Sequence, residues 1–422
     1  MKSFTNHSFL KKIFVVATGT AFAQLITILF SPLLTRVYTP DALGVFGTFS
    51  AILTILTPIA NLGYPYAIVI QENEKSVAAT IALSIGLTFG FCLFLASTLF
   101  VSYPLISEIP NFQRFDNLVW ITPLAVLISS SLVVANQIAI REEIFKAKAT
   151  IYAASSLLVN LLKLLAGMLW PTPSVLIGSS MTGNSFNTLL LTKFIAPVSS
   201  QRIKFSAVIE VAKTRADFAI FRTPQILINV LSQSLPIVFL AASFGSSAAG
   251  YYTLSRSVLT MPVTLISGSL GEVLFPTLAT AQRSGQRLFK KVLISTIALL
   301  LVGIVPFTFV FVFGPDLFDI VFGDKWRTAG EYGTWLSIWL FSVFICSPVN
   351  HVVPIIGEQR LALSFAILKS LARIAVLAIC FKLGVADVYV VAYYSIASFT
   401  VNILYIFVIL RLVYQYDAMY VR

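Results

Sequence analysis

The stretch that decides the fold is FAQLITILFSPLLTRVYTPDALGVFGTFSAI, residues 22–52. It contains two apolar runs, and a short polar segment with Arg36, Tyr38 and Pro40 separates them. With the apolar residues on either side, each run reaches the ~20 residues that a helix needs to cross a bilayer. The stretch therefore predicts two transmembrane helices joined by a short connection.

The whole chain has the composition of a membrane protein. Of its 422 residues, 58% are hydrophobic and only 11% are charged, whereas a soluble protein carries about 25% charged residues. The mean hydropathy is +0.90. The net charge of +12 is not arranged as a basic stripe with interleaved aromatic residues, so nucleic acid is excluded as a partner. The composition predicts an all-α integral membrane protein.

Apolar runs of transmembrane length recur along the chain, and we expect about 12 helices. The first run continues to about Leu34 without a cleavage site, so it is interpreted as a retained span and not as a signal peptide. The predicted spans are 13–34, 44–65, 77–101, 118–138, 150–169, 174–192, 218–243, 252–280, 290–313, 333–355, 362–382 and 388–411.

Basic residues predict the orientation of these spans. If the N-terminus is cytoplasmic, most of the 29 Lys and Arg residues fall in cytoplasmic segments, so both termini are expected inside. The longest connection is a basic loop after the sixth span. It divides the chain into a six-helix bundle at 1–195, a basic cytoplasmic linker at 196–216, and a second six-helix bundle at 217–422.

The two halves carry a weak internal repeat. YTPDALGVFGTFS, from Tyr38, follows the first span, and FGSSAAGYYTLSR, from Phe244, follows the seventh, so that Gly44 aligns with Gly250. A repeat of an even number of spans keeps its orientation in the membrane. The pattern predicts two bundles related by an axis along the membrane normal, with a cavity between them.

The sequence offers no catalytic or metal-binding pattern. Its only histidines are His7 and His351, and Cys92, Cys346 and Cys380 lie in apolar runs without metal-ligand spacing. The phosphate-binding, nucleophile-elbow and zinc-protease motifs do not occur. We therefore expect a protein that is not an enzyme and that carries neither a cofactor nor a metal.

The most acidic stretch is GPDLFDIVFGDKWRTAGEY, residues 314–332. Its apolar residues recur at helical spacing, with acidic residues on the opposite side. This pattern favours a short amphipathic helix on the outer membrane surface over an active site. Trp326 is expected to anchor it at the interface.

Four segments resemble polysaccharide flippases of the Wzx type, in the MATE-like MOP superfamily. FGDKWRTAGEY resembles the glycine–tryptophan–alanine–glycine hallmark after their ninth span. Residues 22–52 resemble their first two spans, including the Arg36-x-Tyr38-x-Pro40 element, and AGYYTLSRSVLTMP and GEVLFPTLA resemble their eighth. The resemblance implies two six-helix bundles and the export of lipid-linked oligosaccharide across a bacterial inner membrane.

Ionisable side chains inside spans are costly and mark candidate sites. Each cation either lines the cavity, where it would meet diphosphate or an acidic sugar, or extends to the membrane surface. Glu272 is the candidate for coupling to H⁺ or Na⁺, and its alternative role is an ordinary hydrogen-bonded carboxylate. The candidate substrate-binding residues are Arg256, Arg222, Arg36, Lys163, Lys369 and Arg373.

The function we expect is translocation of undecaprenyl-diphosphate-linked oligosaccharide repeat units, of O-antigen or exopolysaccharide, to the outer leaflet by alternating access. The expected partners are this substrate and membrane lipid, with polysaccharide polymerase and chain-length proteins as candidates, and we expect a monomer. One alternative is a MATE-type ion-coupled exporter of small cations, which would need buried acids. Another is a partner in a polysaccharide assembly complex that transports nothing itself. The excess of cations in the spans favours an anionic substrate.

Overall fold

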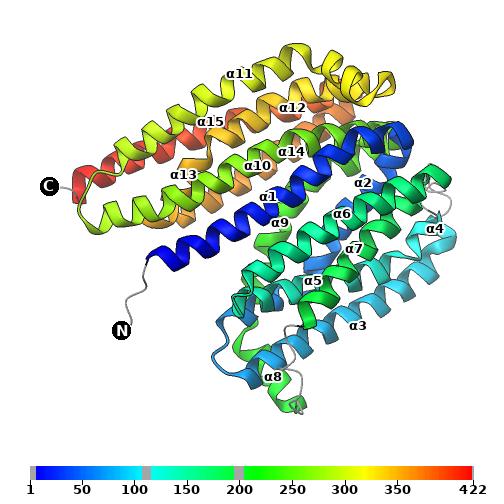
Figure 1. The fold of residues 1–422 in the computed structure, drawn as a ribbon, viewed down its shortest axis with the longest axis horizontal. Helices are drawn as coiled ribbons and strands as arrows, with labels where there is room; N and C mark the ends of the chain where they lie inside the picture. The colour runs from blue at the N-terminus through cyan, green and yellow to red at the C-terminus, as the bar shows by residue number, and fades with distance from the viewer. Residues whose placement is uncertain (1–5, 107–115, 194–203, 421–422) are drawn as a thin grey trace. The chain divides into compact units, whose positions relative to one another are not determined.

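The computed structural model describes the backbone of residues 6–106, 116–193 and 204–420, and these ranges are almost entirely helical (Figure 1). The prediction of an all-α protein is confirmed. The elements in chain order are α1 (Asn6–Val37), α2 (Pro40–Asn61), η1 (Tyr64–Ile70), α3 (Glu74–Ile106), α4 (Asp116–Val119), α5 (Thr122–Arg141), α6 (Phe145–Leu169), α7 (Pro173–Lys193), α8 (Phe205–Thr214), η4 (Phe218–Arg222), α9 (Thr223–Phe244), α10 (Ser246–Arg283), α11 (Phe289–Phe322), η5 (Asp324–Trp326), α12 (Arg327–Ile345), α13 (Ser347–Ile356), α14 (Gln359–Leu383) and α15 (Asp387–Tyr420).

Every predicted span overlaps helical structure over most of its length. The span predicted at 333–355 covers two helices, α12 and α13, which are separated at Cys346. In the described ranges, 10 helical segments are long and apolar enough to cross a membrane, and α1 adds the shorter apolar segment Phe22–Val37. The exact number of spans and the cytoplasmic position of the termini stay predictions.

The polar segment between the first two predicted spans starts helix α2. Thr39 is extended, with φ −82° and ψ 160°, and its hydroxyl oxygen accepts a hydrogen bond of 3.2 Å from the amide of Ala42. Pro40 follows as the first helical residue, where its missing N–H costs nothing. The helix ends at Leu62 and Gly63, which both have positive φ. Capping by Thr39 and Pro40 thus explains the sharp break between α1 and α2.

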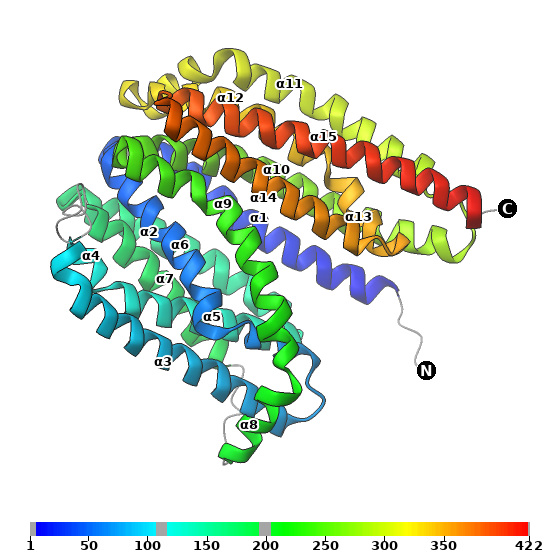
Figure 2. The ribbon, with the colours of Figure 1, turned by 180° about the vertical axis from the view of Figure 1, so that it is seen from behind.

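The chain forms two compact units, Thr18–Ala249 and Gly250–Arg422, the second joined by the N-terminal residues Met1–Ala17. This boundary differs from the predicted linker at 196–216 because α9 packs along α2 and so belongs to the N-terminal unit (Figure 2). Within that linker, Phe205–Thr214 forms helix α8, whereas 196–203 lies outside the described residues. The division into two bundles of six helices stays a prediction.

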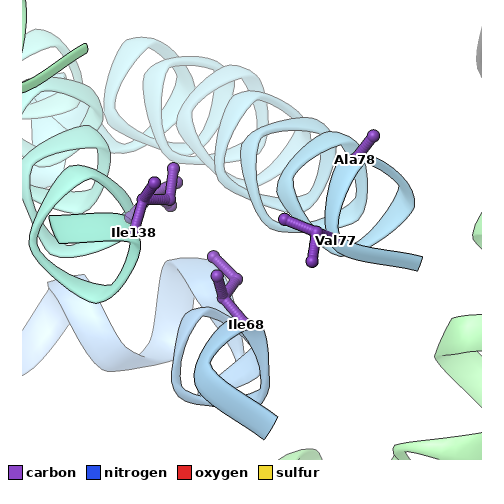
Figure 3. Packing of buried hydrophobic residues seen from close by; sticks show 5 residues of the cluster. Ile68, Val77, Ala78 and Ile138 are labelled. Carbon is purple, nitrogen blue, oxygen red and sulfur yellow. The ribbon is translucent and has the colours of Figure 1, made fainter. Parts of the chain in front are cut away.

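Small apolar clusters hold the helices of the N-terminal unit together. In one of them, Ile68 of η1 packs against Val77 and Ala78 of α3 and Ile138 of α5 (Figure 3). Ile68 and Val77 are 0% exposed. Such close packing matters in a bilayer, because lipid tails are as apolar as these side chains and association depends on van der Waals contact.

In the C-terminal unit, α11 and α12 pack tightly and α15 lies beside α12 (Figure 1). Gly314 of α11 and Gly330 of α12 permit this approach, since a Cβ atom at Gly330 would overlap the backbone of Gly314 and Pro315. This is the small-residue contact by which membrane helices bring their backbones together.

The structure corrects the interpretation of residues 314–332. The stretch Gly314–Phe322 is not a separate surface helix but the end of α11. Trp326 is not an interfacial anchor: it is 0% exposed, and its ring lies edge-on to that of Tyr251 at a centroid distance of 6.1 Å. The close packing of α11 and α12 folds this motif into the helix junction, which the local pattern of apolar residues could not indicate.

Two of the acidic residues of this stretch, Asp316 and Asp319, form ordinary ion pairs with Arg327. Arg327 Nη1 lies 2.8 Å from a carboxylate oxygen of Asp316 and 3.4 Å from one of Asp319. All three side chains are at least one-third exposed, so these pairs contribute little to stability.

Candidate functional site

Three of the predicted cations gather around aromatic rings in the C-terminal unit. Trp339 of α12 is 5% exposed. The guanidinium carbon of Arg256, from α10, lies 5.9 Å from the centroid of its ring, and that of Arg373, from α14, lies 5.0 Å away. Lys369 Nζ lies 4.5 Å from the ring centroid of Tyr405 in α15. Residues more than a hundred positions apart in sequence therefore form one cationic and aromatic cluster.

Arg373 is the most buried of the three cations in this cluster. It is 8% exposed, its guanidinium carbon also lies 5.3 Å from the ring of Tyr394, and its Nε donates a hydrogen bond of 2.9 Å to the Ser398 hydroxyl. A cation over an aromatic face gains about 0.5–2 kcal/mol, and more as water is removed. These contacts offset part of the cost of a charge inside a transmembrane helix.

Lys163 lies in the N-terminal unit, on α6. Its side chain is half-buried, and its Nζ lies 4.5 Å from the ring centroid of Phe46 in α2. The backbone carbonyl of Lys163 accepts a hydrogen bond of 2.7 Å from the hydroxyl of Tyr38, which is itself 0% exposed. The backbone of this residue is thus held by the segment between α1 and α2, and its ammonium group contacts α2 itself.

Arg222 lies at the end of η4, where the chain enters α9. Its side chain is exposed, donates a hydrogen bond of 3.0 Å to Gln225, and lies 5.3 Å from the ring of Tyr66. Nearby, the Tyr64 hydroxyl donates to the carbonyl of Ala212 in α8 at 3.0 Å.

Arg36 and Glu272 complete the predicted set. Arg36 is exposed in the last turn of α1. Glu272 belongs to α10, but its side chain lies outside the described residues. The structure therefore brings together Arg256, Lys369 and Arg373, and it places Lys163, Arg222 and Arg36 at three separate positions of the N-terminal unit.

Two cavities lie within the N-terminal unit. One, of about 380 Å³, is bounded by α2, η1, α5, α7 and α9, and the other, of about 370 Å³, by α1, α6 and α7. Ser180 and Asn184 of α7 line both. Sequence reasoning missed Ser180, Asn184 and Asn187, although their spacing of four and three residues places them on one face of a helix.

Comparison with known proteins identifies the family and the fold. The model of the family described as "Polysaccharide biosynthesis protein" matches residues 33–331, which is more than half of the chain. A Klebsiella pneumoniae protein described as an uncharacterized membrane protein in the cps region is 24% identical over 356 residues, which cover 82% of this chain and 70% of that protein.

Two solved structures are similar to this one over most of their length. The lipid II flippase MurJ, in an inward closed conformation, has a TM-score of 0.71 and 12% identity, with 93% of this chain and 86% of that chain covered. A multidrug resistance MATE family transporter of the MOP superfamily, in an inward-facing conformation, has a TM-score of 0.69 and 13% identity, with 93% and 95% covered. The fold predicted from the flippase resemblance is thereby confirmed, and the chain belongs to the polysaccharide biosynthesis protein family of membrane proteins with the MATE-like fold.

Proposed function

We propose that this protein is a flippase that carries undecaprenyl-diphosphate-linked oligosaccharide from the cytoplasmic to the outer leaflet of a bacterial inner membrane. The observation that carries the proposal is the family match over residues 33–331 in a chain with the MATE-like fold. Oligosaccharide is hydrophilic and cannot cross ~30 Å of hydrocarbon unaided. A protein that shelters it makes no bond and breaks none, in agreement with a sequence that carries no catalytic motif.

The charges within the helices support an anionic substrate. Arg256, Lys369 and Arg373 bring three positive charges to the C-terminal unit, and Lys163 brings one to the N-terminal unit. Diphosphate and acidic sugars are bound most strongly by such cations. In the proposed cycle, the two halves rock between an inward and an outward state, both termini stay cytoplasmic, and Glu272 exchanges H⁺ or Na⁺.

The second candidate is an ion-coupled exporter of small cations, and the fold shared with a MATE transporter favours it. A cation inside a membrane protein is stabilised by buried carboxylates. Near Arg256 and Arg373 it would instead be repelled by their positive charges. Of the described residues that line the two cavities, none is Asp or Glu. The flippase is therefore the function that this charge distribution supports better.

The first experiment measures lipid-linked saccharide in cells that lack this protein, with add-back of the wild type or of Arg256→Ala. We expect the saccharide to accumulate on the cytoplasmic face of the membrane and the wild type to clear it, with Arg256→Ala clearing it poorly. Arg360→Ala, at an exposed position of α14, is the matched control and should behave like the wild type.

A transport assay with the purified protein in proteoliposomes distinguishes the two candidate functions. Translocation of a polyprenyl-diphosphate saccharide by the wild type supports the flippase. Export of small organic cations, without translocation of the saccharide, would contradict the flippase proposal and support the cation exporter. Movement of neither, with surface polysaccharide that is lost in the deletion strain and restored by Arg256→Ala, would favour a partner of an assembly complex that does not transport.

A further inference from the structure

The cavity between α1, α6 and α7 has the lining of a carbohydrate site. It measures about 370 Å³, within the range of about 300–1,000 Å³ that small-molecule sites occupy. Its walls carry one charged group, Lys163, together with side-chain amides and hydroxyls from all three helices. In the part of the chain that the structure describes, no carboxylate lines it. The amides are those of Gln24, Asn160, Asn184 and Asn187.

One amide of this wall has a side-chain oxygen without a hydrogen-bond partner among the described residues. Asn187 is 6% exposed, and its side-chain oxygen Oδ1 accepts no hydrogen bond from the described residues. A buried amide oxygen without a partner costs about 1–3 kcal/mol. Retaining it in a membrane helix is expected where a ligand hydroxyl completes the bond.

The neighbouring polar groups are held in place by one another. Asn160 is 4% exposed and donates to the carbonyl of Ser156 at 2.8 Å, and the Ser156 hydroxyl donates to the carbonyl of Ala23 in α1 at 2.8 Å. The hydroxyls of Thr27 and Ser156 lie 3.2 Å apart. These bonds join α1 to α6 and present a fixed polar wall. Ligand recognition depends on this kind of prior ordering, because less entropy is lost on binding.

The single charge of the cavity selects the ligand's charge. The ammonium of Lys163 lies over the ring of Phe46, and the carbonyl of the same residue is bound to Tyr38. An ammonium in low-dielectric surroundings attracts an anion more strongly than it does in water. Diphosphate carries several negative charges and is best met by paired arginine forks, whereas this wall contains one lysine.

We propose that this cavity binds a carboxylate-bearing sugar residue of the transported saccharide, with the carboxylate at Lys163 and the ring hydroxyls at Asn187 and the neighbouring amides. Amides and hydroxyls both donate and accept hydrogen bonds, as sugar hydroxyls do. The proposal rests on the flippase function and adds to it the chemical class of one sugar. The second cavity, which Ser180 and Asn184 also line, offers room for a further part of the saccharide.

Direct binding tests the site without any transport. The full-length protein in detergent is titrated with glucuronate, galacturonate, glucose and inorganic diphosphate, and binding is followed by saturation-transfer NMR. We expect a uronate to bind and glucose to bind about tenfold more weakly, because the charge-assisted bond to Lys163 is lost. Three results would overturn the proposal. They are that neither uronate binds, that glucose binds as tightly as a uronate, or that an equal concentration of diphosphate displaces the uronate.

Two variants locate the binding within the cavity. Lys163→Met keeps the apolar stem and removes the charge, and Asn187→Leu keeps the shape and removes the amide. Each should weaken uronate binding about tenfold, and Asn187→Leu is expected to fold at least as well as the wild type because it buries no unpaired oxygen. Lys193→Met, at an exposed position at the end of α7, is the matched control for loss of one charge. Unchanged binding in both cavity variants contradicts the assignment.

A transport assay distinguishes an error in this sugar assignment from an error in the proposed flippase function. Proteoliposomes receive two substrates with the same polyprenyl diphosphate, one ending in a uronic acid and one in a neutral hexose. Lys163→Met should slow transport of the acidic substrate about tenfold more than transport of the neutral one. Equal slowing of both overturns the sugar assignment while the flippase stands. If the wild type moves neither substrate, the flippase function fails, and the binding titration still reports on the cavity.

Discussion

The hydroxyl of Tyr38, between helices α1 and α2, donates a hydrogen bond of 2.7 Å to the backbone carbonyl of Lys163 in α6. These residues lie 125 positions apart in sequence. The tyrosine belongs to the Arg36-x-Tyr38-x-Pro40 element that resembles polysaccharide flippases. Its role in this structure is to hold α6 in register with the start of α2, so that Lys163 faces Phe46.

Removal of that hydroxyl is the most direct test of the contact. Tyr38→Phe should lower the free energy of unfolding by about 0.5–1.5 kcal/mol, because one buried hydrogen bond is lost and the ring is kept. The midpoint of thermal unfolding in detergent measures the change. Tyr389→Phe, at a side chain that is 57% exposed, is the control and should leave the midpoint unchanged. A Tyr38→Phe protein as stable as the wild type would show that the bond is unimportant.

Gly167 of α6 gives a second test of the same contact. A Cβ atom at this position would overlap the hydroxyl and ring of Tyr38. Gly167→Ala should therefore destabilise the protein by about 1–3 kcal/mol, as expected for overpacking. Gly178→Ala in α7 is the matched control, since its added methyl group meets nothing within 4 Å. Thermal unfolding of the two variants should differ clearly, and equal midpoints would contradict the packing described.

The close approach of α11 and α12 predicts a larger effect. At Gly330 the added methyl group of alanine would overlap the backbone of Gly314 and Pro315, which cannot rotate away as a side chain can. We expect Gly330→Ala to cost about 3 kcal/mol or more and to reduce the yield of folded protein. Gly268→Ala in α10, with nothing within 4 Å of the new methyl group, should fold normally. Size-exclusion chromatography after membrane extraction provides the measurement.

A carboxylate near the C-terminus caps the start of α11. Asp417 of α15 is 6% exposed, and its two oxygens accept hydrogen bonds of 3.0 and 2.8 Å from the amides of Leu288 and Phe289. Asp417→Ala should cost about 0.5–2 kcal/mol, because two amides at a helix N-terminus lose their acceptor. Asp417→Asn keeps one acceptor oxygen and should fall between alanine and the wild type in thermal unfolding. Identical midpoints for all three proteins would exclude the cap.

Arg373 separates the need for a charge from the need for a guanidinium group. Arg373→Lys keeps the positive charge but loses the Nε bond to Ser398 and the planar contact with Trp339 and Tyr394. We expect a loss of about 1–2 kcal/mol in the free energy of unfolding. Arg360→Lys, at an exposed position of the same helix, should have no effect. If Arg373→Lys unfolds like the wild type, the charge alone suffices and the aromatic contacts are incidental.

The sequence by itself determined the membrane location and the positions of nearly all the helices. Long apolar runs leave helices as the way to satisfy the backbone hydrogen bonds in lipid, and each predicted span overlaps helical structure over most of its length. The break before α2 could also be predicted, because Thr39 and Pro40 start the helix through residues next to them in the chain. Local interactions carry this information, so no knowledge of the tertiary structure was needed.

Only the tertiary structure decided which charges meet and which residues line a cavity. Arg256 and Arg373 share Trp339 because α10, α12 and α14 pack together, and Trp326 is buried, not interfacial, because Gly314 and Gly330 let two backbones approach. A transmembrane helix is apolar on every face, so its sequence does not indicate which face meets protein and which meets lipid. That choice depends on contacts between residues far apart in the chain.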